Sequence, residues 1–101
     1  MQKKVIFWAA GANAKRFMTC LREEVLISAF VDNDMLRWGE MFCGLHIIPA
    51  EDIPKYEYDY IVVTTPSYNG ILNQLTDMRI DEKCIIIPFA PDGREQNRWR
   101  D

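Results

Sequence analysis

Short runs of apolar residues recur along the chain and predict buried β-strands. They are rich in β-branched and aromatic side chains, and none alternates cleanly between apolar and polar positions. Such runs are typical of parallel strands that are covered on both faces. The predicted strands are Val5–Ala9, Leu26–Val31, Tyr60–Thr65 and Cys84–Ile87, with His46–Ile48 as a weaker fifth strand that Pro49 ends.

Two segments between these runs have the three- and four-residue spacing of apolar positions that indicates a helix with one buried face. The first is predicted over Ala12–Glu24. The second is expected to begin after Ser67, which is a good N-cap residue. A short helical turn is expected over Ala50–Ile53, ended by Pro54. The two apolar stripes comprise Ala14, Phe17, Met18, Leu21 and Val25 in the first segment, and Ile71, Leu72, Leu75 and Met78 in the second.

The order of these elements predicts an α/β protein with a doubly wound, Rossmann-like parallel sheet of about five strands. Crossovers between parallel strands are right-handed, so we expect the strand order 3-2-1-4-5. The flavodoxin-like order 2-1-3-4-5 is the alternative. Residues 1–90 form the predicted domain, and the polar, aperiodic residues 91–101 are interpreted as a tail or linker.

Composition narrows the classes of protein to which the chain can belong. It has 101 residues, 49% of them hydrophobic, which suits one domain with a packed core. With a net charge of −3 and no basic patch interleaved with aromatic residues, no nucleic-acid partner is expected. No apolar run approaches the roughly 20 residues of a membrane span, and a cytoplasmic location is predicted. The three cysteines include no C-x-x-C pair, so no zinc site or disulfide framework is expected.

The turn after the first strand resembles the glycine-rich G-x-G-x-x-G turn that binds dinucleotides. Its three glycine positions hold Ala9, Gly11 and Ala14. The middle glycine lets the backbone approach a pyrophosphate, whereas alanine at the first position resists a positive φ. Backbone N–H groups at Ala12 and Asn13 would face the phosphate. The alternative is a tight strand-to-helix turn whose small residues serve packing alone.

An acidic residue ends the second predicted strand at the position where Rossmann proteins bind ribose. Asp32 follows Gly11 at about the 20-residue spacing of that motif. Its carboxylate could accept hydrogen bonds from a ribose diol and would repel a 2′-phosphate, which favours NAD over NADP. Asn33 follows it and is grouped with the predicted site. In the alternative interpretation, Asp32 caps the turn that follows the strand.

Hydroxyl groups follow the fourth predicted strand, beside the point where the strand order of the sheet reverses. Ligands of open α/β sheets bind at this switch point. Thr64, Thr65 and Ser67 are therefore candidate contacts for ribose or phosphate. Strand termination and helix capping are the alternative roles, at least equally favoured for Ser67.

No set of residues in the sequence predicts catalysis by this chain alone. It lacks a Tyr-x-x-x-Lys pair, a G-x-x-x-x-G-K-[ST] phosphate loop and a G-x-S-x-G nucleophile turn. We therefore assign no catalytic residue and no metal ligand.

Four segments together resemble a known group of domains. They are A-A-G-A-N-A-K-R-F at 9–17, F-V-D-N-D at 30–34, R-W-G-E-M-F-C-G-L-H-I-I-P at 37–49 and Y-D-Y-I-V-V-T-T-P at 58–66. In this order they resemble the small Rossmann-like domains of bacterial surface-polysaccharide enzymes. These domains lie beside FkbM-type methyltransferases and glycosyltransferases, or at the N-termini of nucleotide-sugar epimerase/dehydratases and sugar acyltransferases.

The resemblance implies binding of NAD, CoA or a nucleotide-sugar, with contacts at Gly11, Ala12, Asn13 and Asp32. The leading hypothesis is a non-catalytic nucleotide-binding domain of a glycan-biosynthesis protein, with NAD or a nucleotide-sugar as ligand and an attached or partner catalytic domain. One alternative is a structural or interaction module that has the fold and no ligand. Another is the nucleotide-binding half of a truncated sugar-modifying enzyme.

Overall fold

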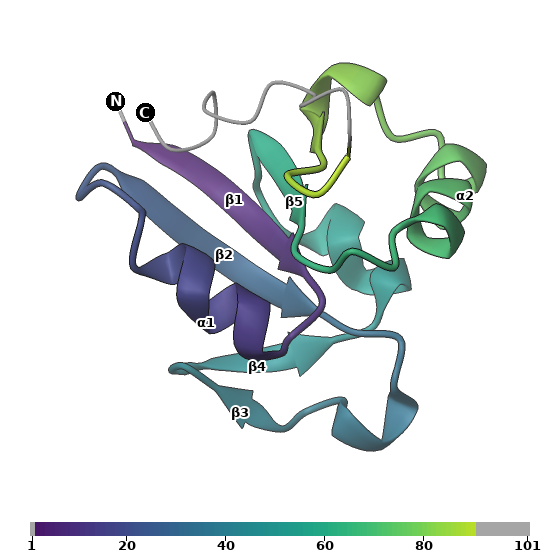
Figure 1. Cartoon of the computed structure of the whole chain (residues 1–101). Coiled ribbons are helices and arrows are strands. Elements are labelled where there is room, and N and C mark those ends of the chain that lie inside the picture. Colours follow the sequence, from purple (N-terminus) through teal and green to yellow (C-terminus); the bar gives the residue numbers. More distant parts are fainter. Residues whose placement is uncertain (1, 91–101) are drawn as a thin grey trace.

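A computed structural model describes residues 2–90 as a sheet of six strands with helices on both faces (Figure 1). The strands are β1 (Lys3–Trp8), β2 (Val25–Val31), β3 (Met41–Phe42), β4 (Leu45–Ile48), β5 (Tyr60–Val63) and β6 (Ile85–Ile86). The α-helices are α1 (Ala12–Met18) and α2 (Asn69–Asp77), and the 3₁₀ helices are η1 (Met35–Arg37), η2 (Ala50–Lys55) and η3 (Glu82–Cys84).

The sheet has the order β3-β4-β2-β1-β5-β6. Its five parallel strands, taken in chain order, follow the predicted order 3-2-1-4-5, which confirms the Rossmann-like arrangement. The flavodoxin-like alternative is wrong because β4 pairs outside β2. The strands that follow β1 are added on one side of it up to β4, and those from β5 onward are added on its other side. The switch point of the strand order therefore lies where β1 and β5 end.

The core has two layers, one on each face of the sheet. On one face, Ile71 and Leu75 of α2 and Ile53 of η2 cover a cluster that includes Ile6 and Trp8 of β1. On the other face, α1 buries Ala14 over the alternate β1 residues Val5 and Phe7 and their neighbours. Both faces of the central strands are therefore covered, as their continuous apolar runs predict. Figure 1 shows α1 and α2 on opposite sides of β1.

One strand was not predicted from the sequence. β3 forms an antiparallel hairpin with β4, in which Phe42 pairs with Leu45. The two residues of the turn, Cys43 and Gly44, both have positive φ, at 51° and 89°. A two-residue hairpin turn with positive φ at both positions suits the twist of the strands, but it is usually marked by Asn-Gly or Asp-Gly. Cys-Gly carries no such signal, and a two-residue strand has no period.

The first helix is shorter than predicted, because it ends at Met18 and not at Glu24. Beyond this point the backbone bonds of Thr19 and Cys20 reach back three residues, to Arg16 and Phe17. The Thr19 hydroxyl also bonds to the Arg16 carbonyl, a local bond that competes with helix continuation. The apolar spacing nevertheless continues through a turn, so the periodicity alone overestimated the helix.

The second helix begins later than predicted, and Ser67 is not its N-cap. Tyr68 occupies the cap position, with no side-chain capping bond, and the backbone N–H of Ser67 bonds instead to the Thr65 hydroxyl oxygen at 3.2 Å. η2 extends to Lys55, so Pro54 lies inside this turn and does not end it.

Within residues 2–90, no helix combines the length and the apolar character needed to cross a membrane. The polar stretch predicted as a tail, residues 91–101, lies outside the described residues.

Candidate functional site

The turn after β1 has the backbone shape of a glycine turn although an alanine occupies it. Ala9 has φ of +99°, a region that favours glycine and that costs a residue with a side chain roughly 1–3 kcal/mol. Its N–H bonds to the Val31 carbonyl at 2.8 Å. Its carbonyl oxygen accepts a hydrogen bond from the Thr64 hydroxyl at 2.7 Å. Neighbouring strands therefore hold Ala9 in this strained conformation.

Gly11 lies at the exposed point of the turn and is the N-cap of α1. A Cβ atom built on Gly11 would meet no described heavy atom within 4 Å. Among the described residues, no atom therefore fills the space above Gly11, and a ligand could enter it. Ala12 is exposed and Asn13 is half-buried in the first turn of α1, where no side chain caps the backbone N–H groups. α1 has only seven residues. A ligand at its N-terminus would therefore be bound by the backbone amides of the turn and not by the dipole of a long helix.

Asp32 lies beside this turn, as its spacing from Gly11 predicted, and its carboxylate binds the protein itself. One oxygen accepts from the backbone N–H of Ala10 at 3.0 Å, and the other accepts from that of Asp34 at 2.9 Å. The side chain is one-fifth exposed. Asp32 therefore caps the following turn, as the alternative interpretation proposed, and also ties β2 to the glycine-like turn. A carboxylate has about four acceptor sites, so two remain for another donor.

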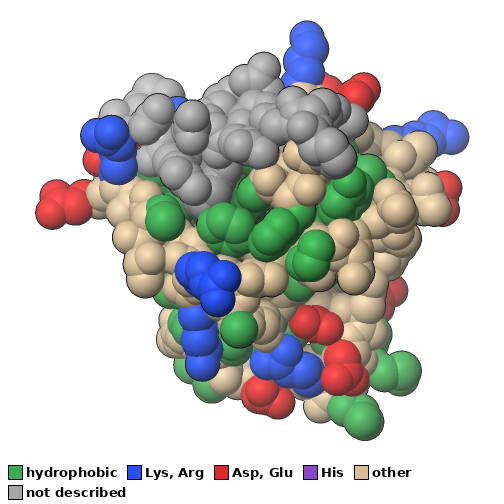
Figure 2. Space-filling view, viewed as in Figure 1, with side chains coloured by type: hydrophobic (Ala, Val, Ile, Leu, Met, Phe, Trp, Pro, Cys, Tyr) green, Lys and Arg blue, Asp and Glu red, His purple; other side chains and the backbone are tan. Residues whose placement is uncertain are grey.

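Arg37 completes this part of the site and was not predicted from the sequence. It lies 3.6 Å from the Asp32 carboxylate and donates a hydrogen bond to the carbonyl of Ala10. It also lies 3.4 Å from Glu40 and stacks over the Phe42 ring. It is the last residue of the short 3₁₀ helix η1, and the sequence gave no signal for it because its contacts depend on the tertiary structure. Figure 2 shows basic and acidic side chains intermixed over the part of the surface formed by α1, η1 and β3.

The three candidate hydroxyl residues after β5 have different environments. Thr64 is buried, and its hydroxyl lies within bonding distance of the carbonyls of Trp8 and Ala9, so it supports the turn and does not line a crevice. Thr65 is half-buried and accepts a bond from the N–H of Ser67, which is exposed. Thr65 and Ser67 are thus the two hydroxyl residues of this set that are accessible from solvent.

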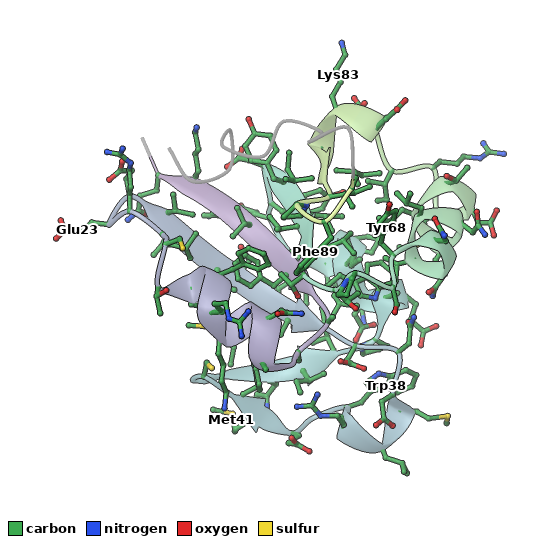
Figure 3. All side chains as sticks on the ribbon, in the orientation of Figure 1. Glu23, Trp38, Met41, Tyr68, Lys83 and Phe89 are labelled. Carbon is green, nitrogen blue, oxygen red and sulfur yellow. The ribbon has the colours of Figure 1, made fainter. Side chains whose placement is uncertain are left out.

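A pair of carboxamides joins the loop after β2 to α2. Asn33 donates to Gln74 at 2.7 Å, and Gln74 donates back to Asn33 at 3.2 Å. Trp38, which Figure 3 shows beside the loop between β2 and η1, donates its indole N–H to the Asp32 carbonyl at 2.7 Å. A cavity of about 240 Å³ lies next to this pair, lined by Asn33, Trp38, Pro49, Ala50, Glu51 and Gln74.

Two groups with shifted pKa values lie at the other end of the sheet. The pKa of Glu57 is lowered by a hydrogen bond from Lys4 and by its positive charge. The pKa of Tyr58 is raised by burial and by the charge of Cys84. Glu57 and Tyr58 precede β5, whereas the Gly11 turn follows β1. Within residues 2–90, no group of three or more His, Cys, Asp or Glu side chains could hold a metal ion.

Residues 1–86 match the family described as C2185-like, N-terminal, and the chain belongs to this family. No curated protein matches the chain. It resembles the crystal structure of UDP-D-quinovosamine 4-dehydrogenase from Vibrio fischeri, with a TM-score of 0.63 and 18% identity over 86% of this chain and 76% of that one. It also resembles the structure of RSP in complex with β-NAD⁺ and operator DNA, with a TM-score of 0.62 and 15% identity over 91% of this chain.

The chain spans about half of that second protein, 48% of its length. At these identities the two neighbours show the fold alone, which is Rossmann-like in agreement with the strand order. The operator DNA belongs to the neighbour, and the expectation that this chain has no nucleic-acid partner stays a prediction.

Proposed function

We propose that this chain is a non-catalytic nucleotide-binding domain of a glycan-biosynthesis protein, with NAD or a nucleotide-sugar as its ligand. An attached or partner protein would carry the catalytic residues. The geometry of the turn after β1 is the main support for this proposal. Ala9 keeps the positive φ of a glycine turn, and Gly11 keeps open space above it. Together these features leave the exposed backbone of the turn accessible to a phosphate.

The proposed contacts follow the ends of three neighbouring strands, β1, β2 and β5, around the switch point. Backbone amides from Gly11 to Ala14 bind phosphate, and the free acceptor sites of Asp32 bind the ribose hydroxyls. Thr65 and Ser67 line the opposite side, while Thr64 holds the turn in place. The two similar structures support this assignment, since one is a UDP-sugar enzyme and the other contains β-NAD⁺.

A thermal-shift titration with NAD, CoA, ATP and UDP-sugars tests the proposal. A ligand at a hundredfold excess over its dissociation constant should stabilise the fold by roughly 3 kcal/mol. Gly11→Ala should abolish this shift, because the added methyl group would occupy the space of the phosphate. The same variant should fold, because its Cβ meets no described atom. Gly70→Ala, which adds a methyl group in equally open space on α2, is the matched control and should keep the shift.

A structural or interaction module remains the second candidate, and one observation favours it. The polar groups expected to bind a ligand already bond to the protein, with Asp32 engaged by two backbone N–H groups and Thr64 by two carbonyls. This candidate predicts no shift with any nucleotide, and Gly11→Ala would then change nothing but the intrinsic stability.

A further inference from the structure

The first half of β2 is an open edge of the sheet, because β4 covers only its second half. β4 pairs with β2 at Phe30 and Val31, and Figure 1 shows the two strands meeting near the carboxyl end of β2. Among the described residues, no strand therefore lies on the outer side of Val25–Ser28. Natural sheets usually protect such an edge with charged residues or proline, and Val-Leu-Ile-Ser contains neither.

The backbone of this edge can pair with another strand. The Glu24 carbonyl accepts a hydrogen bond from the N–H of Lys3 on β1, and the backbone groups of a strand point alternately to its two sides. The N–H and carbonyl of Ile27 and the carbonyl of Val25 therefore point away from β1. The Val25 N–H is already bonded to the Arg22 carbonyl, so the Ile27 N–H is the donor that this edge offers.

A groove of about 440 Å³ lies between this edge and the segment that follows η2. Two large apolar side chains that line it, Leu26 and Tyr56, are 42% and 38% exposed. Lys55 also lines the groove. The Ser28 hydroxyl bonds to the carbonyl of Glu57, so this segment lies over the Ser28 end of the edge. The edge therefore has an apolar centre and a basic group at its carboxyl end.

We propose that two copies of this chain associate through this edge as an antiparallel pair with two-fold symmetry. In the register centred on Leu26, the Ile27 N–H of each copy donates to the Val25 carbonyl of the other. The two Leu26 side chains then meet on the axis as a close cross-strand pair, with a Tyr56 ring from each copy beside them. This association goes beyond the proposed function, because the edge lies at the end of the sheet opposite the Gly11 turn.

Charge complementarity favours a second copy as the occupant of this edge. The same register brings Glu24, which is exposed, opposite Ser28 of the other copy, beside Lys55. Lys55 pairs with Asp52 of its own chain at 3.2 Å, but its side chain is 73% exposed and can reach a second carboxylate. The axis repeats this contact. Because so short an edge makes a small interface, we expect a weak dimer, with a dissociation constant of the order of micromolar.

Sedimentation equilibrium of the full chain, from about 1 µM to about 1 mM, measures this association. The wild type should change from monomer to dimer across this range. Leu26→Lys should weaken the dimer about tenfold or more, because like charges would lie directly opposite each other on the axis. Leu36→Lys is the matched control and should leave the association unchanged, since Leu36 is 91% exposed on η1, outside the edge. Thermal unfolding checks that each variant is folded.

Charge reversal tests the register of the pair. Glu24→Lys and Lys55→Glu should each weaken the dimer about fivefold, because each places like charges across the axis. The double variant should restore it, since the two charges attract again with their positions exchanged. Asp77→Lys makes the same change of charge on α2, away from the edge, and should have no effect.

Amide hydrogen exchange locates the contact, because the Ile27 N–H should exchange more slowly at high than at low protein concentration. A monomer throughout the concentration range would overturn the proposal. So would a dimer that Leu26→Lys leaves intact, or a double charge reversal that stays as weak as its single variants. These results leave the proposed function untouched, because nucleotide binding is measured at the other end of the sheet.

Discussion

The hydroxyl of Thr64 donates a hydrogen bond to the carbonyl oxygen of Ala9 at 2.7 Å, from the end of β5 to the turn after β1. Ala9 has φ of +99°, which an alanine adopts only when its surroundings impose it. Thr64 is one of those surroundings, since it also contacts the Trp8 carbonyl through both its hydroxyl and its N–H. A residue that the sequence suggested as a ligand contact therefore helps to shape the turn that we propose binds phosphate.

Replacing Thr64 by valine should destabilise the fold, because valine has nearly the same shape and lacks the hydroxyl. The Ala9 carbonyl would lose its hydrogen bond, which costs about 1–2 kcal/mol for a buried partner. Urea denaturation at equilibrium measures this difference. Thr76→Val, at an exposed position of α2, is the control and should change stability by less than about 0.5 kcal/mol. Equal stability of Thr64→Val and wild type would show that the bond does not hold the turn.

Replacing Ala9 by glycine should stabilise the fold, which is unusual for a change to glycine. Glycine would relieve the strain of the positive φ, which costs alanine about 1–3 kcal/mol. The greater freedom of glycine in the unfolded chain opposes this stabilisation by about 0.5–1 kcal/mol. The net expectation is a stabilisation of about 1 kcal/mol.

The control for Ala9→Gly is Ala10→Gly, one residue further along the turn. Ala10 is buried and has no positive φ, so the same substitution there should destabilise by about 1 kcal/mol. Because Thr64 and Ala9 are in contact, Thr64→Val should also cost less in the Ala9→Gly background than in the wild type. Destabilisation by Ala9→Gly would mean that the turn is not strained.

The order of the parallel strands could be predicted from the sequence because buried strands have a continuous apolar signal. The ends of elements could not, since they depend on individual hydrogen bonds. The apolar spacing through Leu21 and Val25 continues past Met18, although the backbone turns there. β3 carried no signal, because it has two residues and follows from the positive φ of Cys43 and Gly44.

The residues of the candidate site could be predicted where they directly follow a parallel strand, because the ends of parallel strands lie at one edge of the sheet. Gly11 and Asp32 each follow a strand that ends at the same edge of the sheet, so their spacing was enough to place them together. Arg37 and Gln74 could not be found this way. Arg37 reaches its partner Asp32 through the segment that contains η1. Gln74 reaches its partner Asn33 from α2, a helix that belongs to another crossover.

Removing the Asp32 side chain should cost stability even in the absence of a ligand. Asp32→Ala removes the acceptor of two backbone N–H groups and leaves Arg37 without this carboxylate. Bonds to a charged group contribute about 1.5–3 kcal/mol each, and partial exposure reduces this, so we expect a loss of about 2–3 kcal/mol in total. Thermal and urea unfolding measure it.

Asp32→Asn tests how much of this loss comes from hydrogen bonding. The carboxamide keeps one acceptor oxygen, so the asparagine variant should lose about half as much stability as the alanine variant. Asp77→Ala, an exposed carboxylate at the end of α2, is the control. If Asp32→Ala were as stable as this control, the carboxylate would be free for a ligand and would not tie the turns together.

The ion pair between Lys4 and Glu57, at the opposite end of the sheet, should make stability depend on pH in the acidic range. A hydrogen bond from Lys4 and its charge lower the pKa of Glu57 from its ordinary value of 4.5. The carboxyl group therefore binds a proton more weakly in the folded chain than in the unfolded chain. Its contribution is fully present above the ordinary value and is lost as the pH falls through the lower, folded pKa.

Glu57→Gln should remove this dependence. The difference in melting temperature between wild type and variant should be largest well above the ordinary pKa of 4.5 and should disappear as the pH falls through the lowered, folded pKa, where the wild-type carboxyl becomes protonated. Because Glu57 is 81% exposed, the difference should be small and should shrink further in about 1 M salt. Glu23→Gln is the matched control on another loop. A difference that is constant across the pH range would show that Glu57 contributes through its shape and not through its charge.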